Sequence, residues 1–188
     1  MLSVIIPTEG VEQSAVATLA ALVPGAAAGV IREVLLVDRS GNGVIERVAD
    51  VSGCRFLRFE GSHAAALAAG ARQARSPWLM FLHAGAVLDS GWIDETTQFI
   101  QRVSMSDHPR AGIFRYARSP YAETRLRDGF KFLARMVSGP SADQGLLIAR
   151  DHYERLGGYR PDASRSEARL LRQLRRSRTL LRCRIMVA

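Results

Sequence analysis

The sequence predicts one α/β domain in which helices flank a mostly parallel central sheet, and three observations support this fold class. Residues 2–7 and 33–38 are apolar runs rich in valine, isoleucine and leucine, and a segment of helical length separates them. Such a pair is typical of a βαβ unit with buried parallel strands. Strand-like and helix-like segments then alternate as far as residue 116. The chain of 188 residues is also long enough to bury one substantial core.

The first two-thirds of the chain supplies most of the expected elements. Residues 11–22 favour a helix, and we expect Pro24-Gly25 to break it. The run at 78–83 is apolar on both faces and therefore predicts a central strand. The other elements predicted here are helices over 44–52, 63–75 and 91–103, and strands over 54–59 and 113–116.

The last third has a less regular pattern. An amphipathic helix is expected over 121–137, a strand over 144–149 and a short helix over 151–156. A basic helix over 164–177 and a final strand over 179–187 follow. No internal repeat or linker interrupts the chain, so we expect residues 1–188 to form a single domain.

The charge of the chain is strongly basic and unevenly placed. The formal net charge is +8, and Lys131 is the only lysine among 26 basic residues. Eight arginines lie between residues 165 and 184, where Glu167 is the only acid. This charge favours anionic partners. Because no aromatic residues of the kind that stack on bases are interleaved, a solvated or membrane-surface face is favoured over a specific nucleic-acid reader.

Composition also bears on location. No apolar run reaches the ~20 residues needed to span a bilayer, and no basic region precedes the first apolar stretch. We therefore expect a cytoplasmic protein, with peripheral contact at an anionic inner-membrane surface left open. Cys54 and Cys183 lack metal-ligand spacing and are expected to be small core residues.

Polar side chains follow three of the predicted strands. Thr8 and Asp38 end the first two, and His83 ends the central one. Ligands of such sheets bind beyond the carboxyl ends of the strands. Asp38 is therefore a candidate to accept hydrogen bonds from a nucleobase or ribose, and turn formation is the alternative. His83 suits a metal or a phosphate, and a structural hydrogen bond is the alternative.

Two further candidate sites lie in the last third. Asp143 and Gln144 precede Gly145, and this spacing suits either a cleft or a capped loop. Glu167 is a candidate general base that neighbouring arginines would keep ionised. The Ser164-x-x-Glu167 spacing equally suits a capping box at the start of the basic helix.

Together these segments resemble the family-2 glycosyltransferases of the GT-A fold, a Rossmann-like fold. The resemblance is to a small bacterial branch with a His-Ala-Asp motif and a Gly-Asp-Gln-Gly-Leu motif. It rests on five segments: Ser3-Val4-Ile5-Ile6-Pro7-Thr8, Glu33-Val34-Leu35-Leu36-Val37-Asp38, Trp78-Leu79-Met80-Phe81-Leu82-His83-Ala84, Asp143-Gln144-Gly145-Leu146-Leu147 and Leu156-Gly157-Gly158-Tyr159. Their order and spacing cover nearly the whole chain.

The resemblance implies transfer of a sugar from a nucleotide-sugar donor to an acceptor hydroxyl, with a divalent cation and a carboxylate base. Residues 1–116 would then form a nucleotide-binding half and 117–188 an acceptor-side half. Glu167 would occupy the general-base position. The implied substrate-binding residues are Pro7, Thr8, Glu12, Asp38, His83, Asp143 and Gln144.

The sequence departs from the family at three acidic positions. Gly85 stands where the family has its metal-binding Asp, the loop 39–43 lacks its acid, and Ser166-Glu167 replaces a Glu-Asp pair. A Mg²⁺ or Mn²⁺ ion would need another ligand, for which Asp89 is the candidate. Arginines that neutralise the diphosphate without metal are the alternative.

These departures leave three functions open. The first is a glycosyltransferase of weakened activity, and the second is an inactive GT-A-like domain that binds a nucleotide or a partner. The third is a basic module for membrane surfaces or RNA. The first two require the carboxyl ends of the strands at 2–7, 33–38 and 78–83 to form one binding cradle.

Overall fold

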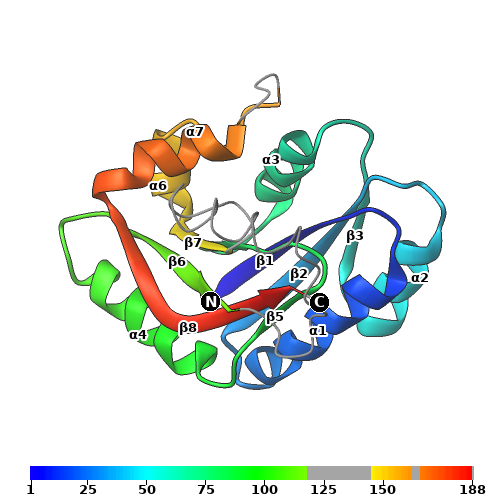
Figure 1. Ribbon diagram of the computed structural model, residues 1–188, viewed down its shortest axis with the longest axis horizontal. Coiled ribbons are helices and arrows are strands. Elements are labelled where there is room, and N and C mark those ends of the chain that lie inside the picture. The colour runs from blue at the N-terminus through cyan, green and yellow to red at the C-terminus, as the bar shows by residue number, and fades with distance from the viewer. Residues whose placement is uncertain (118–144, 162–165, 188) are drawn as a thin grey trace, which may run out of the picture.

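A mixed β-sheet forms the centre of the protein, whose computed structural model describes residues 1–117, 145–161 and 166–187 (Figure 1). Within these residues the sheet has eight strands in the order β3-β2-β1-β4-β7-β6-β8-β5. The strands are β1 (Leu2–Thr8), β2 (Ile31–Asp38), β3 (Arg55–Arg58), β4 (Trp78–Phe81), β5 (Ala86–Leu88), β6 (Ala111–Tyr116), β7 (Leu146–Ala149) and β8 (Arg178–Val187).

The direction of the strands divides the sheet. Strands β3, β2, β1 and β4 are mutually parallel neighbours, as the βαβ pattern predicts. Strand β7 is antiparallel to both β4 and β6, and β5 is antiparallel to β8, whereas β6 and β8 are parallel. The carboxyl ends of β1, β2, β3 and β4 therefore lie along one edge of the sheet.

Helices cover both faces of this sheet (Figure 1). Helices α1 (Glu12–Ala27), α2 (Val44–Ser52) and α4 (Trp92–Ser104) lie on one face. Helices α3 (His63–Gln73), α6 (Arg150–Arg155) and α7 (Ser166–Gln173) lie on the other. A short 3₁₀ turn, η2 (Leu174–Arg176), joins α7 to β8.

The strands supply side chains alternately to two apolar cores. Val4 and Ile6 of β1 pack with the α1, α2 and α4 side, whereas Ile5 packs with the α3, α6 and α7 side. Met80 and Phe81 of β4 divide in the same way. Because successive side chains of a strand point to opposite faces, near-continuous apolar runs are what a sheet covered on both sides requires. The predicted central position of residues 78–83 is confirmed, since β4 lies between β1 and β7.

Several predicted boundaries differ from the structure. Pro24 does not break the first helix, which continues to Ala27. The proline lies in the interior of α1, and Gly25 packs where a Cβ would be 2.3 Å from the ring of Trp92. The expected basic helix is shorter than predicted because η2 follows α7 at residue 174. Strand β5 was not predicted, and the helix expected over 121–137 lies outside the described residues.

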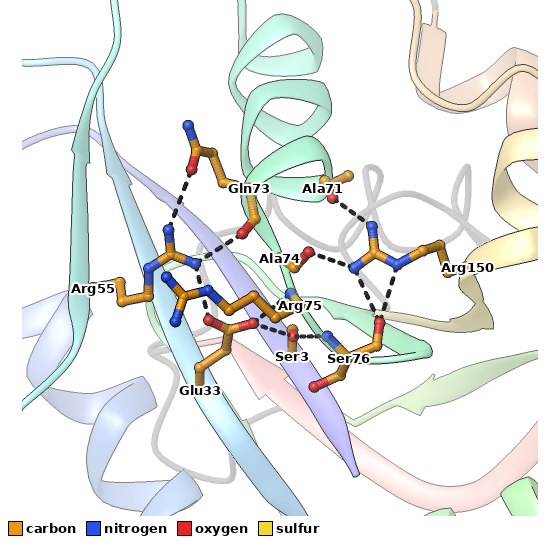
Figure 2. A network of polar contacts seen from close by, with 9 residues as sticks. All are labelled: Ser3, Glu33, Arg55, Ala71, Gln73, Ala74, Arg75, Ser76 and Arg150. Atoms are coloured by element: carbon orange, nitrogen blue, oxygen red, sulfur yellow. Dashed lines mark hydrogen bonds and ion pairs between the residues drawn. The ribbon is translucent and has the colours of Figure 1, made fainter.

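A polar network closes the opposite edge of the sheet, near the start of β1 and the end of α3 (Figure 2). Glu33 accepts hydrogen bonds from the Ser3 hydroxyl at 2.6 Å and the Arg75 backbone N–H at 2.6 Å, and its other oxygen pairs with Arg55 at 2.9 Å. Arg150 donates to the backbone carbonyls of Ala71, Ala74 and Ser76. Since these carbonyls follow or end α3, the network fixes that helix against β1, β2 and β7.

Membrane crossing is not supported by the helices described. None of those within residues 1–117, 145–161 and 166–187 is long and apolar enough to span a bilayer.

Candidate functional site

The carboxyl ends of β1 and β2 bring Thr8 and Asp38 together as sequence reasoning predicts. The two residues are paired in register and each is 1% exposed. The Thr8 hydroxyl donates to Asp38 Oδ1 at 3.1 Å. Pro7 precedes Thr8 within the buried strand.

Asp38 also organises the turn that follows it. Its carboxylate accepts hydrogen bonds from the Ser40 hydroxyl, at 2.9 Å to Oδ2, and from the Gly41 N–H at 3.0 Å. The turn-forming role considered for Asp38 is therefore present. The Ser40 hydroxyl also lies 3.0 Å from Oδ1, so with the Thr8 hydroxyl the three donors make four contacts, two to each carboxylate oxygen.

The loops after β1, β2 and β3 are fastened to one another. Arg39 forms an ion pair with Glu9 after β1, and its Nε donates to the Gly61 carbonyl after β3 at 2.9 Å. Gly10 has φ 78° and lies so close to the turn after β2 that a Cβ would be 2.4 Å from Ser40 Oγ. Only glycine allows this approach. The edge is therefore a connected platform formed by three loops.

His83 lies two residues after the end of β4, on the same edge of the sheet. Its ring stacks on that of His63, with centroids 4.9 Å apart and planes 7° from parallel. His63 is the first residue of α3, whose start is fixed by Ser62, because the Ser62 hydroxyl accepts the Ala65 N–H at 3.2 Å.

Glu167, in the first turn of α7, reaches the same place. Its Oε1 lies 3.7 Å from His63 Nε2, and the two side chains are 22% and 28% exposed. One nitrogen from each histidine and one oxygen from Glu167 all lie within 4.8 Å of one another. His63, His83 and Glu167, which we call the His-His-Glu cluster, therefore form a partly exposed group from three separate elements.

An aromatic residue, Tyr159, lies near Glu167. Tyr159 is buried, and burial first and the negative charge of Glu167 second raise its pKa well above the ordinary value. Its backbone N–H donates to the Tyr153 hydroxyl at 2.9 Å. The positive φ of Gly157, 74°, ends α6 as a C-terminal glycine should. Tyr159 is therefore a buried, uncharged phenol near the cluster.

Gly85, which the resemblance places where the family has an acid, adopts a backbone conformation that favours glycine. It has φ 91°, and its N–H donates to Ser14 and Thr18 of α1 at 2.8 and 2.9 Å. A side chain other than that of glycine would be strained there. The residue anchors the end of β4 to α1, and it supplies no ligand atom.

The other predicted site residues lie apart from the cluster or outside the described chain. The carboxylate of Asp89, proposed from sequence as a metal ligand, accepts the Arg184 N–H of β8 at 3.0 Å and is not a member of the His-His-Glu cluster. Glu12 is exposed at the start of α1. Asp143 and Gln144 lie outside the described residues.

His63 is the site residue that sequence reasoning missed. The signal available was its place at the start of a helix that follows a strand of the parallel half, with a serine cap before it. Such a position lies at the same sheet edge as the strand ends, and it becomes informative only when the strand order is known.

Comparison with known proteins finds likeness in structure only. No family model matches the chain, and no curated protein does. S. aureus TarS 1–349 in complex with UDP is similar to the whole chain, with a TM-score of 0.70 and 14% identity. A Pyrobaculum calidifontis mannosyltransferase in complex with GDP-Man and Mn²⁺ gives a TM-score of 0.67 at 17% identity over the same extent.

These likenesses decide the fold. The chain has a glycosyltransferase-like fold. TarS in complex with UDP-GlcNAc is a further similar structure, with a TM-score of 0.66 and 12% identity. The chain spans 60% of the length of the UDP complex of TarS and 56% of that of the mannosyltransferase, so it corresponds to less than two thirds of either.

Proposed function

We propose that this glycosyltransferase-like domain binds a nucleotide-sugar donor at the carboxyl edge of β1, β2 and β4 and transfers the sugar to an acceptor hydroxyl. One observation carries the proposal: the connected loop platform holding Thr8 and Asp38 shares this edge with His83 and with the carboxylate of Glu167. The similar structures, which hold UDP, UDP-GlcNAc and GDP-Man, support the choice of donor class.

In this proposal Pro7, Thr8 and Asp38 border the nucleoside. A ribose hydroxyl or a base N–H could replace the Ser40 hydroxyl as a donor to the Asp38 carboxylate. Asp38 is only 1% exposed, so the turn that Ser40 and Gly41 form over it must shift for direct contact. Glu12 is a further candidate beside the donor.

Glu167 is the proposed general base. It would take the proton from the acceptor hydroxyl while that oxygen bonds to the sugar and the nucleoside diphosphate leaves. Its carboxylate is partly exposed and lies beside His63, so acceptor and proton can reach it. Asp143 and Gln144 remain the sequence-based candidates for acceptor contact.

The divalent cation that the fold suggests must fit the ligands present. Mg²⁺ is held through oxygen ligands with several waters, but Gly85 offers no side chain and Asp89 binds the β8 backbone. The His-His-Glu cluster has two imidazoles, which suit transition ions. The residues therefore fit a transition-metal cation better than Mg²⁺, and such an ion would supply positive charge near a diphosphate.

Calorimetric titration tests donor binding. UDP, GDP and their sugars are titrated against the wild-type chain, Asp38→Asn and the control Asp50→Asn, whose side chain is exposed in α2. We expect binding of one nucleotide, weakened at least tenfold in Asp38→Asn and unchanged in the control. Absence of binding to all of these ligands would overturn the proposal.

Measuring sugar transfer distinguishes an active glycosyltransferase from an inactive domain that only binds the nucleotide. Glu167→Gln keeps the size of the side chain but removes the base, so transfer should fall by about 10²-fold or more while nucleotide affinity stays within a few-fold. Nucleotide binding without transfer in the wild type would identify an inactive binding domain.

A further inference from the structure

We infer that the His-His-Glu cluster is a transition-metal site that binds a Zn²⁺-like ion in preference to Mg²⁺. The inference deepens the proposed function, because the cluster lies on the same sheet edge. Its existence as a metal site does not depend on whether the protein transfers sugar.

The geometry brings three ligands from distant parts of the chain to one point. His63 is the first residue of α3, His83 lies two residues after the end of β4, and Glu167 is the second residue of α7. A tetrahedral ion with bonds of about 2.0–2.1 Å places its ligand atoms roughly 3.3 Å apart. The ligand atoms here are within 4.8 Å of one another, and the His63–Glu167 pair is already at 3.7 Å. Closure by up to about 1.5 Å is needed, and it requires the two stacked imidazole rings to rotate toward a common point.

The elements that carry the ligands are rigid enough to preform the site. Ser62 caps α3 directly before His63, and β4 is a buried central strand. The Ser166 hydroxyl, beside Glu167, accepts the Arg160 N–H at the start of α7. A site whose ligands sit at the ends of packed helices and strands pays little ordering cost when the ion binds.

The pair of histidines distinguishes a metal site from a simple ion pair. One histidine would suffice to pair with Glu167, whereas here a second imidazole is stacked on the first at 4.9 Å. Two imidazoles in such contact repel if both carry a proton, but both can donate nitrogen lone pairs to one cation once their rings turn out of the parallel stack. The side chains of His63 and Glu167 are 28% and 22% exposed, whereas His63 Nε2 itself is buried, so an ion would enter past the partly exposed carboxylate.

The donor set selects the class of ion. Two imidazole nitrogens and one carboxylate oxygen suit Zn²⁺ and its neighbours, whereas Mg²⁺ prefers oxygen ligands alone. Three protein ligands leave a fourth tetrahedral position open, as in sites where the ion binds water or substrate. An anionic phosphate oxygen is a ligand of suitable charge for that position.

Occupancy would also change the role of Glu167. A carboxylate that gives one oxygen to a cation is a weaker proton acceptor at the other oxygen, so metal binding and the proposed base function meet at the same side chain.

Zn²⁺ binding measured by calorimetry on the full chain tests the inference. We expect one ion per chain, with affinity reduced at least tenfold in each of His63→Ala, His83→Ala and Glu167→Gln. His108→Ala is the matched control, because His108 is an exposed histidine after α4 and outside the cluster. Thermal unfolding of each variant in the absence of metal shows whether it folds, and His83→Gln replaces His83→Ala if the latter does not.

Co²⁺ gives a second, spectroscopic readout. Intense visible absorption is expected for a four-coordinate ion in the wild type and in His108→Ala, and it should be lost in His63→Ala. Millimolar Mg²⁺ should not displace Zn²⁺. Equal Zn²⁺ affinity in wild type and all three cluster variants, or displacement by Mg²⁺, would overturn the inference.

These outcomes are separable from those of the proposed function. Zn²⁺ binding that survives when UDP and GDP fail to bind would leave the metal site standing and remove the donor site. Nucleotide binding in a chain that binds no Zn²⁺ would support the donor site and rule out the metal site.

Discussion

Glu33 shows how much of the structure can depend on one carboxylate. Burial alone raises its pKa, but hydrogen bonds from Ser3, Arg55 and the Arg75 backbone, with the charge of Arg55, outweigh burial and lower the pKa below the ordinary 4.5. The side chain is 9% exposed, so these contacts are little screened by water. Its role is structural, at the edge of the sheet opposite the candidate site.

Replacing Glu33 by glutamine should destabilise the fold. Hydrogen bonds to a charged group contribute about 1.5–3 kcal/mol, and an amide cannot accept all those that the carboxylate accepts. We therefore expect Glu33→Gln to lower the free energy of unfolding by about 1–3 kcal/mol in urea titrations. Glu46→Gln is the control, since Glu46 pairs with Arg58 while 48% exposed, and its effect should stay within about 0.5 kcal/mol. An equal loss in both variants would contradict this account.

The same carboxylate gives a pH dependence of known sign. Because the pKa of Glu33 is lower in the folded than in the unfolded state, its stabilisation is present above the ordinary pKa of 4.5. It is lost as the pH falls through the folded-state value. The difference in unfolding free energy between wild type and Glu33→Gln should thus be largest near pH 7 and shrink below about pH 4.5. A difference that grows on acidification would refute the assignment.

Cys183 is confirmed as a core residue, and its surroundings predict low reactivity. Burial first, and then hydrogen bonds and charges of Glu95 and Asp89, raise the pKa of this thiol far above the ordinary 9.0. The pKa of half-buried Cys54 is also raised, chiefly by burial.

Alkylation of the folded protein with iodoacetamide at pH 8 should therefore modify Cys183 more slowly than Cys54, because only the thiolate reacts. Mass spectrometry of digested protein measures each site. In denaturant the two rates should become similar, and faster labelling of Cys183 in the folded state would contradict the expectation.

At the scale of elements, helix packing decided features that local sequence signals could not. Pro24-Gly25 is a strong breaker by local rules, yet α1 continues to Ala27 because Gly25 lies against Trp92 of α4. Contact between two helices distant in sequence outweighed the local preference. The apolar runs of the strands, by contrast, predicted the places of all described strands except β5, because burial on both faces requires consecutive apolar residues.

Substitution of Gly70 in α3 tests how closely that helix must approach the sheet. A Cβ at this position would lie 2.4 Å from Ile5 Cγ2 in β1. Ile5 is fully buried and its branched side chain is stiff. At an exposed position inside a helix, Gly→Ala stabilises the protein by about 1 kcal/mol. Here the steric clash with Ile5 should outweigh that gain. We expect Gly70→Ala to destabilise by about 1–3 kcal/mol in urea.

Gly91→Ala is the comparison for this experiment. Its nearest heavy atom would be Cys183 Sγ at 3.5 Å, an ordinary contact. Its backbone is right-handed, so the change in stability should remain within about 0.5 kcal/mol. A stabilised Gly70→Ala would show that α3 can move away from β1 at no cost.

For the whole molecule, charge is the property that sequence determines most directly. The net charge is +8, and the structure exposes Arg172, Arg175 and Arg176 at the end of α7 and in η2. These residues make the predicted contact with an anionic membrane surface testable, although binding by charge alone does not identify a biological partner.

Vesicles containing anionic lipid should bind the protein at low salt and release it as ionic strength rises, since exposed charges are screened over about 8 Å at 0.15 M. Cosedimentation should fall strongly when Arg172, Arg175 and Arg176 become glutamine. A control with Arg47, Arg102 and Arg110 changed to glutamine loses the same charge from exposed positions elsewhere. An equal loss of vesicle binding in both triple variants would show that binding depends on net charge and not on the position of the arginines.

The sequence by itself determined the kinds and order of most of the described elements, though not β5, together with the charge and the polar residues that end strands, because these follow from local composition and burial pattern. Thr8 and Asp38 could be paired in advance, since parallel neighbours bring their ends together. Only the tertiary structure placed β7 between β4 and β6 and brought His63 and Glu167 to His83. Those contacts join helix starts that are far apart along the chain, and their meeting depends on strand order and helix packing, which no local pattern encodes.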